Sequence, residues 1–174
     1  MRLEPLDLNQ LNPDMEEMAQ SYGSFQTWIS YAGHHPNLTK AIFELLKVQR
    51  QSSVLPGDII ELASVTVSLC NQCRYCTYQH SAKALDLGIT QAQLDGILDE
   101  SAKDLFSERD WKVVQYAKAM TKDVHSLRLP ILEALKQDWR EDQLVELTWR
   151  IAFMNAFNRF NDALGIPPEK ITLE

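Results

Sequence analysis

The sequence predicts an all-α protein, and three observations support this fold class. Apolar residues recur at three- and four-residue spacing over most of the chain. Residues that favour helix termini bound the same segments. No segment has an evident partner strand, and nothing resembles a strand-helix-strand unit. We therefore expect a single compact helical domain over residues 1–174, with about seven helices and no linker.

The N-terminal half is expected to hold three of these helices. Residues 12–23 begin with Asn12 as a candidate N-cap and Pro13 at the first helical position. Residues 35–56 carry apolar residues at helical spacing and end at a Pro-Gly pair. Residues 57–70 are rich in β-branched residues, which favour strands. We predict a buried helix there, because the neighbouring segments are helical.

Four further helices are expected after this point, and they cover residues 75–88, 89–100, 107–125 and 140–165. Gly88 and Gly165 lie where a C-terminal cap is needed. Thr90 and Ser107 are candidate N-caps, and acidic residues follow in the first turns of the last two helices.

The composition limits the classes of function. The formal net charge is −7 and the pI is about 5.1, so the clusters of Lys and Arg that neutralise a nucleic-acid backbone are missing. The N-terminus lacks the apolar run of a signal peptide, and no segment approaches the roughly 20 apolar residues of a membrane-spanning helix. We therefore expect a cytoplasmic protein that binds neither nucleic acid nor membrane.

The three cysteines of the chain lie within seven positions, in the segment CNQCRYCTYQH. This clustering does not fit a secreted scaffold with disulfides distributed along the chain. On a helix, Cys73, Cys76 and His80 share one face. A Cys-x-x-Cys pair can close a disulfide across one turn, and a helix N-terminus lowers the pKa of a thiol in its first turn. A redox-active dithiol is therefore one interpretation, beside a metal site and an ordinary buried helix.

Two further residues fit the dithiol interpretation. His80 lies one turn after Cys76, near enough to deprotonate it directly or through a water. Glu61 lies in the otherwise apolar segment DIIELASVTVSL, where an unpaired carboxylate would be costly to bury. A glutamate paired with a histidine would orient the imidazole and raise its basicity.

The spacing of these four residues, and the surrounding VTVSLCNQCRYCTYQHSAKALDLGIT, resemble the signature of the alkylhydroperoxidase D and carboxymuconolactone decarboxylase superfamily. Residues 25–125 resemble the family core, and the C-terminal LVELTWRIAFMNAFNRFNDALGI resembles a peroxidase-related subgroup. The resemblance implies an all-α domain that assembles into trimers or hexamers. It also implies reduction of hydrogen peroxide or organic hydroperoxides.

The resemblance assigns a role to each residue. Cys76 would be peroxidatic and pass through a sulfenic acid, Cys73 would be the proton donor and resolving partner, and Glu61 and His80 would form a proton relay. No bound cofactor is implied, and the reductant would be an external dithiol such as a lipoyl adapter protein. Alkylhydroperoxidase D itself carries histidine just before its second cysteine, where this chain has Tyr75.

Several alternatives remain open. Cys70, Cys73, Cys76 and His80 resemble the three-cysteine run of bacterial ferredoxins with histidine in the fourth place. The segment lacks a second motif or a proline after the last ligand and continues into a helix, whereas zinc often binds between two separated knuckles. We therefore expect no metal and a structural role for Cys70 at the end of a helix. A decarboxylase-like enzyme that acts on a small carboxylic acid would use Glu61 and His80 without thiols. A redox-sensing protein would be oxidised once without turnover.

The last predicted helix carries two patterns. Its apolar residues cover a wide arc, which suggests that a subunit interface covers part of it. Asn155, Asn158 and Asn161 share one face. This face could make a polar contact with another helix or subunit, or it could be exposed to solvent.

Overall fold

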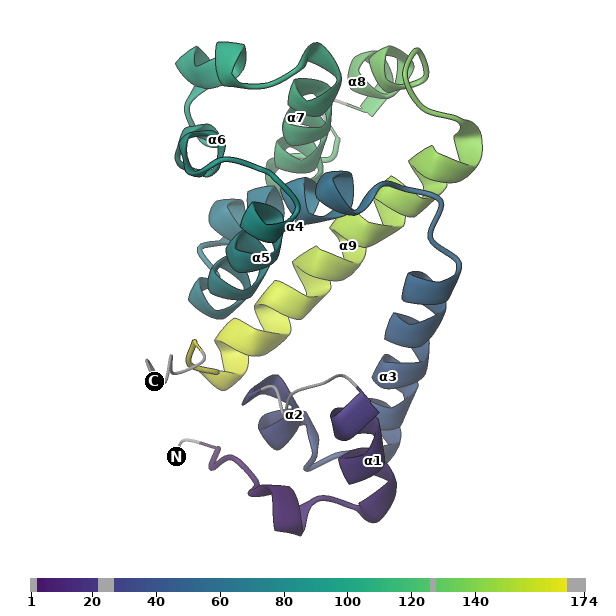
Figure 1. The fold of residues 1–174 in the computed structure, drawn as a ribbon, viewed down its shortest axis with the longest axis vertical. Coiled ribbons are helices and arrows are strands. Elements are labelled where there is room, and N and C mark those ends of the chain that lie inside the picture. The colour runs from purple at the N-terminus through teal and green to yellow at the C-terminus, as the bar shows by residue number, and fades with distance from the viewer. Residues whose placement is uncertain (1–2, 22–26, 126–127, 169–174) are drawn as a thin grey trace.

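The computed structural model describes residues 3–21, 27–125 and 128–168, and this part of the chain contains nine α-helices, two short 3-10 helices and no strand (Figure 1). The elements are η1 (Leu8–Gln10), α1 (Pro13–Ser21), α2 (Thr27–Ala32), α3 (Pro36–Gln51), α4 (Gly57–Asn71), α5 (Arg74–Asp86), α6 (Gln91–Gly96), η2 (Glu100–Leu105), α7 (Glu108–Lys122), α8 (Arg128–Leu135) and α9 (Glu141–Leu164). The all-α fold class is confirmed. The two α-helices beyond the seven expected are α2 and α8, which have six and eight residues and are too short to show a clear period.

The local signals for helix termini act as the sequence predicts. The Asn12 side chain accepts a hydrogen bond from the backbone N–H of Asp14 at the start of α1; the predicted end of this helix at residue 23 lies outside the described residues. Thr90 forms a capping box with Gln93, and Ser107 accepts a hydrogen bond from the third residue of α7. These caps satisfy backbone N–H groups that the helices cannot bond internally.

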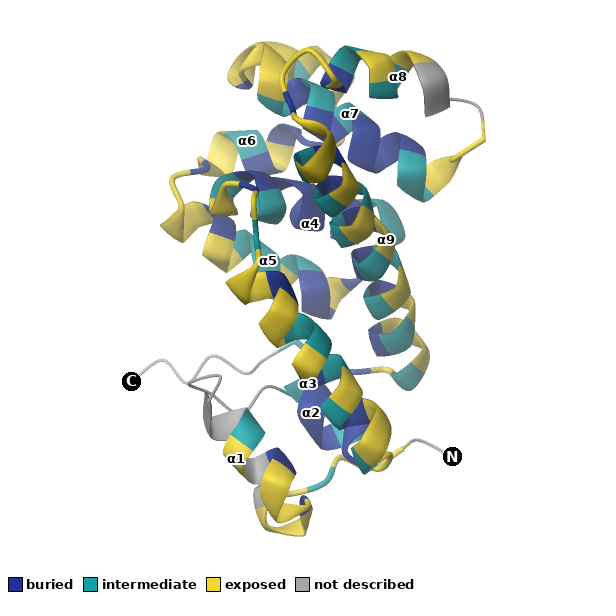
Figure 2. Cartoon of the chain, turned by 90° about the vertical axis from the view of Figure 1, so that its right-hand side faces the viewer, coloured by how far each residue is buried: buried dark blue, intermediate teal, exposed yellow. Residues whose placement is uncertain are grey.

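Helix α4 forms the centre of the core, and α5, α7 and α9 pack around it. Figure 2 shows it as a largely buried helix, whereas α1 and α3 expose much of their surface. Val65 and Val67 have no exposed surface, and burial of such side chains stabilises the fold by about 1.5–3 kcal/mol each. The tertiary burial explains why a β-branched segment is helical here.

Three buried hydroxyl groups of α4 are satisfied within the helix itself. Ser64, Thr66 and Ser68 each donate to the backbone carbonyl four residues earlier, at 2.7–2.8 Å. Because these hydroxyls need no partner from another helix, the small serine and threonine side chains can lie where α4 contacts its neighbours. Neighbouring helices can therefore approach α4 closely.

A two-residue joint connects α4 to α5. Gln72 adopts a left-handed backbone conformation, with φ 59°, and the N–H groups of Gln72 and Cys73 bond to carbonyls of the last turn of α4. Cys73 is then the N-cap of α5. The joint thus places the first turn of α5 beside the end of α4.

Helix α9 runs diagonally across the molecule, with α4 and α5 on one side and α3 on the other in Figure 1. Glu146 on α9 holds the loop between α3 and α4, since it accepts hydrogen bonds from Ser53 Oγ and from the backbone N–H groups of Val54 and Leu55, at 2.7–3.2 Å. Arg150, one turn later, bonds to both Glu146 and Gln49. These contacts fix α9 relative to α3 and leave a cavity between the helices.

Candidate active site

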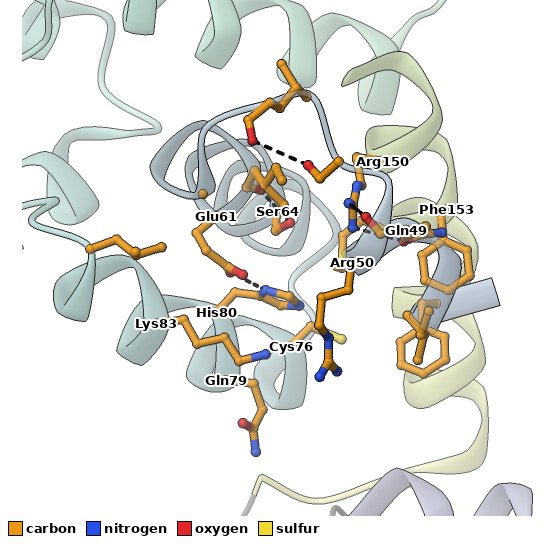
Figure 3. Close-up of a pocket in the computed structure, with 18 of the residues that line it drawn as sticks. Gln49, Arg50, Glu61, Ser64, Cys76, Gln79, His80, Lys83, Arg150 and Phe153 are labelled. Carbon is orange, nitrogen blue, oxygen red and sulfur yellow. Dashed lines mark hydrogen bonds and ion pairs between the residues drawn. The ribbon is translucent and has the colours of Figure 1, made fainter. Parts of the chain in front are cut away.

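A cavity of about 720 Å³ lies between α3, α4, α5 and α9 (Figure 3). Glu61, Cys76 and His80 line it, whereas Cys73 is not part of the wall. Much of the remaining wall is apolar, and it includes Trp28, Leu46, Leu55, Ile60, Phe153, Met154 and Phe157. The cavity therefore combines polar, reactive side chains on one side with an apolar surface.

The two cysteines of the Cys-x-x-Cys pair are free thiols in direct contact. Cys73 Sγ donates to Cys76 Sγ across 2.9 Å, and both side chains are almost fully buried. Cys76 is the third residue of α5 and Cys73 is the N-cap. Unpaired N–H groups and the helix dipole favour negative charge in this first turn.

The protonation of the pair is asymmetric. Donation from Cys73 lowers the pKa of Cys76, and the amides of Asn161 and Asn158 act in the same direction, against the effect of burial. The same Cys73–Cys76 hydrogen bond and burial raise the pKa of Cys73. The arrangement therefore favours a thiolate on Cys76 and a proton on Cys73.

His80 and Glu61 form an ion-pair contact across the α4–α5 interface. His80 Nδ1 lies 2.5 Å from Glu61 Oε2, and the two side chains are 19% and 14% exposed. Because the carboxylate lies at Nδ1, the other ring nitrogen, Nε2, is left for groups in the cavity. Figure 3 shows the ring between Glu61 and Cys76 in this view. The structure thus brings all four predicted site residues together, and their catalytic roles stay predictions.

The fold and the sequence relate the chain to known proteins. The model of the carboxymuconolactone decarboxylase family matches residues 36–119, which include all four predicted site residues. The uncharacterized protein YdfG of Bacillus subtilis is 25% identical over 139 residues, which cover 79% of this chain and 93% of YdfG.

Two solved structures share the fold. A peroxidase-related protein of Ralstonia eutropha, described as an alkylhydroperoxidase AhpD core, is similar with a TM-score of 0.84 and 20% identity, over 97% of this chain and 92% of that one. The debrominase Bmp8, solved in complex with 2,3,4-tribromopyrrole, has a TM-score of 0.80 and 21% identity, over 97% and 92% of the two chains.

Residues 36–119 of the chain thus match the carboxymuconolactone decarboxylase family, and the chain shares the alkylhydroperoxidase D-like fold.

Two asparagines of α9 lie at the candidate site, and the sequence indicated them only in part. Asn161 Nδ2 donates to Cys76 Sγ at 3.2 Å, and Asn158 Nδ2 donates to Ser68 Oγ at 3.3 Å. Neither asparagine has exposed surface, whereas Asn155 is half-buried. Of the alternatives for this face, the contact with another helix is therefore correct. The pattern in the sequence that indicated this contact is the presence of amide side chains at every third position of an otherwise apolar helix.

Cys70 lies apart from the pair. It is the second-last residue of α4, is half-buried, and does not line the cavity. Burial raises its pKa, while Lys122 and Lys118 on α7 oppose this effect. Cys70 lies at the end of α4, as expected, and its structural role stays a prediction. The described residues contain no group of three or more His, Cys, Asp or Glu side chains placed to share a metal ion.

Tyr75 is buried and lines the cavity. Tyr78, by contrast, is 37% exposed. Tyr75 therefore both packs and contributes to the cavity wall. In the described part of the chain, no helix combines the length and apolar character that crossing a membrane requires.

Proposed function

We propose that the protein is a thiol-dependent peroxidase that reduces hydrogen peroxide or organic hydroperoxides through a Cys73/Cys76 dithiol cycle. The observation that carries this proposal is the contact between the two sulfurs, with the thiolate-favouring Cys76 on the cavity wall. A thiolate is the form that attacks peroxides. A neighbouring thiol allows the product to be resolved as a disulfide.

In the first step, the Cys76 thiolate attacks the terminal oxygen of the hydroperoxide. The O–O bond breaks, the terminal OH is transferred to sulfur as a sulfenic acid, and the alkoxide or hydroxide leaves. His80, oriented by Glu61 at 2.5 Å, acts as the general base that takes the proton of the Cys76 thiol, and it returns this proton to the leaving group, which becomes alcohol or water.

In the second step, Cys73 sulfur attacks the sulfenic sulfur of Cys76. The S–S bond forms, the S–O bond breaks, and the hydroxyl leaves as water with the Cys73 proton. The dithiol has then supplied two electrons. An external dithiol reduces the disulfide by exchange, and a dihydrolipoyl group on an adapter protein is the donor we propose.

Serine variants test the roles of the cysteines. Cys76→Ser should abolish peroxide consumption with dithiothreitol as reductant, because serine cannot form the sulfenic acid. Cys73→Ser should leave Cys76 trappable by a sulfenate probe. Cys70→Ser is the matched control and should keep the wild-type rate. Undiminished turnover by Cys76→Ser would contradict the proposal.

The same assay separates the alternatives. A redox sensor would consume about one equivalent of peroxide and stop, whereas a peroxidase continues while dithiothreitol lasts. A decarboxylase-like enzyme would keep its activity on a small carboxylic acid when both Cys73 and Cys76 are replaced by serine, since it would depend on Glu61 and His80.

Reductive debromination is a second candidate, favoured by the aromatic residues that line the same cavity as Cys76 and by the shared fold with the debrominase Bmp8. The dithiol would supply two electrons, so that the C–Br bond is replaced by C–H, bromide leaves and Cys73 and Cys76 form a disulfide. Bromide release from 2,3,4-tribromopyrrole without consumption of any hydroperoxide would favour this candidate.

We also propose that the protein is a homo-oligomer, a trimer or hexamer. The outer face of α9 supports this, because it exposes an apolar stripe, which consists of Val145, Trp149, Ala152 and Ala156. Val145 is 71% exposed and Trp149 47%. Such a stripe on a helix usually packs against a partner, and a second copy of this chain would bury it.

A further inference from the structure

Asn71, the last residue of α4, makes two hydrogen bonds to asparagines of α9. Its Nδ2 atom donates to Asn155 Oδ1 and to Asn158 Oδ1, at 3.0 Å each, so that both amide protons are used. We propose that Asn71 is a positioning residue for Cys76, because it fixes the amide of Asn158 with its nitrogen on the side of the cysteine. The inference deepens the proposed function, since it rests on Cys76 being the reacting thiolate.

The contacts of Asn158 allow only one orientation of its amide. Asn158 Nδ2 donates to Ser68 Oγ at 3.3 Å and to Met154 Sδ at 3.4 Å. The Ser68 hydroxyl donates its own proton to the Ser64 carbonyl at 2.7 Å, so it can only accept from Asn158, and a thioether sulfur has no proton to donate. The nitrogen must therefore lie on this side, and the oxygen must lie at Asn71.

The two asparagines that act on Cys76 differ in how they are held. Neither Asn158 nor Asn161 has exposed surface, and hydrogen bonds from both lower the pKa of Cys76. Within the described residues, the Oδ1 atom of Asn161 has no hydrogen-bond partner, whereas that of Asn158 accepts from Asn71. The Asn161 amide can thus turn when Cys76 gains or loses its proton, while Asn158 keeps its N–H group in place. A donor that is fixed beforehand needs no reorganisation when negative charge develops on sulfur.

A neutral substitution of Asn71 keeps the other groups that act on the charge of Cys76. Cys73 donates to Cys76, and Asp162 on α9 opposes its ionisation. The titratable and charged side chains of the cavity wall come from four helices, and they are Arg50 of α3, Glu61 of α4, Tyr75, His80 and Lys83 of α5, and Arg150 of α9. A shift caused by such a substitution therefore reports on the amides and not on a change of charge.

The test is a double-mutant cycle between Asn71→Leu and Asn158→Leu in a Cys70→Ser background. Leucine has nearly the shape of asparagine and carries neither a charge nor a hydrogen-bonding group. Asn71→Leu should lower the rate of Cys76 alkylation by iodoacetamide at pH 7 by about threefold, as for weakening of one hydrogen bond, and move the pH midpoint of this rate upwards. In the Asn158→Leu background, Asn71→Leu should change neither quantity.

Asn155→Leu is the matched control for this cycle. It removes the other acceptor of Asn71 but leaves the hydrogen bond from Asn71 to Asn158, so the alkylation rate of Cys76 should stay at the parent value. Peptide mass spectrometry would assign the label to Cys76, and circular dichroism would verify that each variant is folded.

Asn71→Asp gives a second measurement that does not require a substitution of buried Asn158. A carboxylate only accepts hydrogen bonds, so the Asn158 amide would have to turn its nitrogen towards it and its oxygen towards Cys76. The alkylation rate should fall further than in Gln72→Glu, which adds the same charge at the exposed neighbouring position.

The outcomes separate this inference from the proposed function. An equal shift by Asn71→Leu with and without Asn158 would overturn the inference, as would an unchanged rate in folded Asn71→Leu or equal effects of Asn71→Asp and Gln72→Glu. Failure of the Cys70→Ser parent to consume any hydroperoxide would overturn the proposed function, while the alkylation cycle would still decide the role of Asn71.

Discussion

The side chain of Asn161 presents its amide nitrogen to the sulfur of Cys76 at 3.2 Å. A thiolate has no proton to donate, so it can only accept a hydrogen bond from the N–H side of an amide. The Asn161 Oδ1 atom is buried and has no hydrogen-bond partner among the described residues, and a buried acceptor without a hydrogen bond destabilises the folded state. The residue is therefore better suited to stabilising charge on Cys76 than to stabilising the fold.

Replacement of Asn161 by aspartate should slow the reaction of Cys76. The added negative charge opposes the thiolate and raises the pKa of Cys76, so less thiolate is present near neutral pH. We expect the alkylation rate with iodoacetamide at pH 7 to fall by about tenfold, and the pH midpoint of this rate to move upwards. Measurement in a Cys70→Ser background removes the signal of the third thiol.

Asn155→Asp is the matched control, since it adds the same charge on the same helix. The Asn155 amide donates to Thr121 Oγ1 and to the Ile151 carbonyl and does not contact the sulfur. We expect a change of less than about twofold in the alkylation rate, because the added charge is more distant and partly screened. An equal effect of both variants would show that the contact with Cys76 has no special role.

At the level of single residues, sequence reasoning found the residues that lie close in the chain or carry an unusual polarity. Cys73, Cys76 and His80 lie within eight positions, and Glu61 stands out in an apolar segment. Asn161 lies 85 positions from Cys76. Helical periodicity places it on a face but does not say which other helix covers that face, so its contact with sulfur needed the structure.

Helix α9 is held at its N-terminal half by Glu146, whose carboxylate accepts hydrogen bonds from the loop between α3 and α4 and from Arg150. Burial opposes the ionisation of Glu146, but the N–H group of Val54, Arg150 and Ser53 outweigh it and keep its pKa below the usual value. A carboxyl group with a lowered pKa stabilises the folded state above its usual pKa, and this contribution disappears as the pH falls through the lowered value.

Glu146→Gln should therefore lower the free energy of unfolding by about 2 kcal/mol near pH 7, as is typical for loss of charged hydrogen bonds. The difference from the wild type should shrink in acid, as the pH falls through the lowered pKa of Glu146 and the carboxyl group of the wild type becomes protonated. Urea unfolding at the two pH values measures both effects. Glu44→Gln, at an exposed position of α3, should have little effect; a difference for Glu146→Gln that persists in acid would contradict the electrostatic explanation.

The prediction of elements was accurate where caps and apolar periodicity agreed. Both signals are present in α7, with Ser107 as N-cap, and the C-terminal glycine of α9 has the expected left-handed conformation. The short helices α2 and α8 span too few residues to show a period. In helix α4, local composition alone would have given the wrong element, because its β-branched residues favour a strand and only the surrounding helices make it helical.

At the scale of the whole molecule, the exposed stripe on α9 can be tested through the molecular mass in solution. Light scattering should give three or six times the 20.0 kDa of one chain. Val145→Glu should lower this mass, because a charge in the centre of an apolar interface is costly to bury. Val124→Glu, at another exposed valine, should not; a wild-type protein that is monomeric at every concentration would contradict the proposed assembly.

The cavity is also a property of the whole molecule, and it could not be predicted from the sequence. Its wall combines residues from α2, α3, α4, α5 and α9, among them Trp28, Arg50 and Phe153. These residues carry no shared motif, and their approach depends on the angles at which the helices cross. The sequence therefore predicted that Cys73, Cys76, His80 and Glu61 lie together, but not the space in which a substrate would lie.

The 2.9 Å contact between the sulfurs of Cys73 and Cys76 affects how well the protein would resist over-oxidation by excess peroxide. A disulfide bond is about 2.05 Å long, so the two atoms need to approach by less than about 1 Å, and the first turn of α5 need not unwind. A sulfenic acid on Cys76 would then be captured before a second peroxide molecule could convert it irreversibly to a sulfinic acid. Under the proposed cycle, we expect the protein to remain active in a large excess of peroxide. The supply of reductant, rather than irreversible oxidation of Cys76, would then limit the number of turnovers.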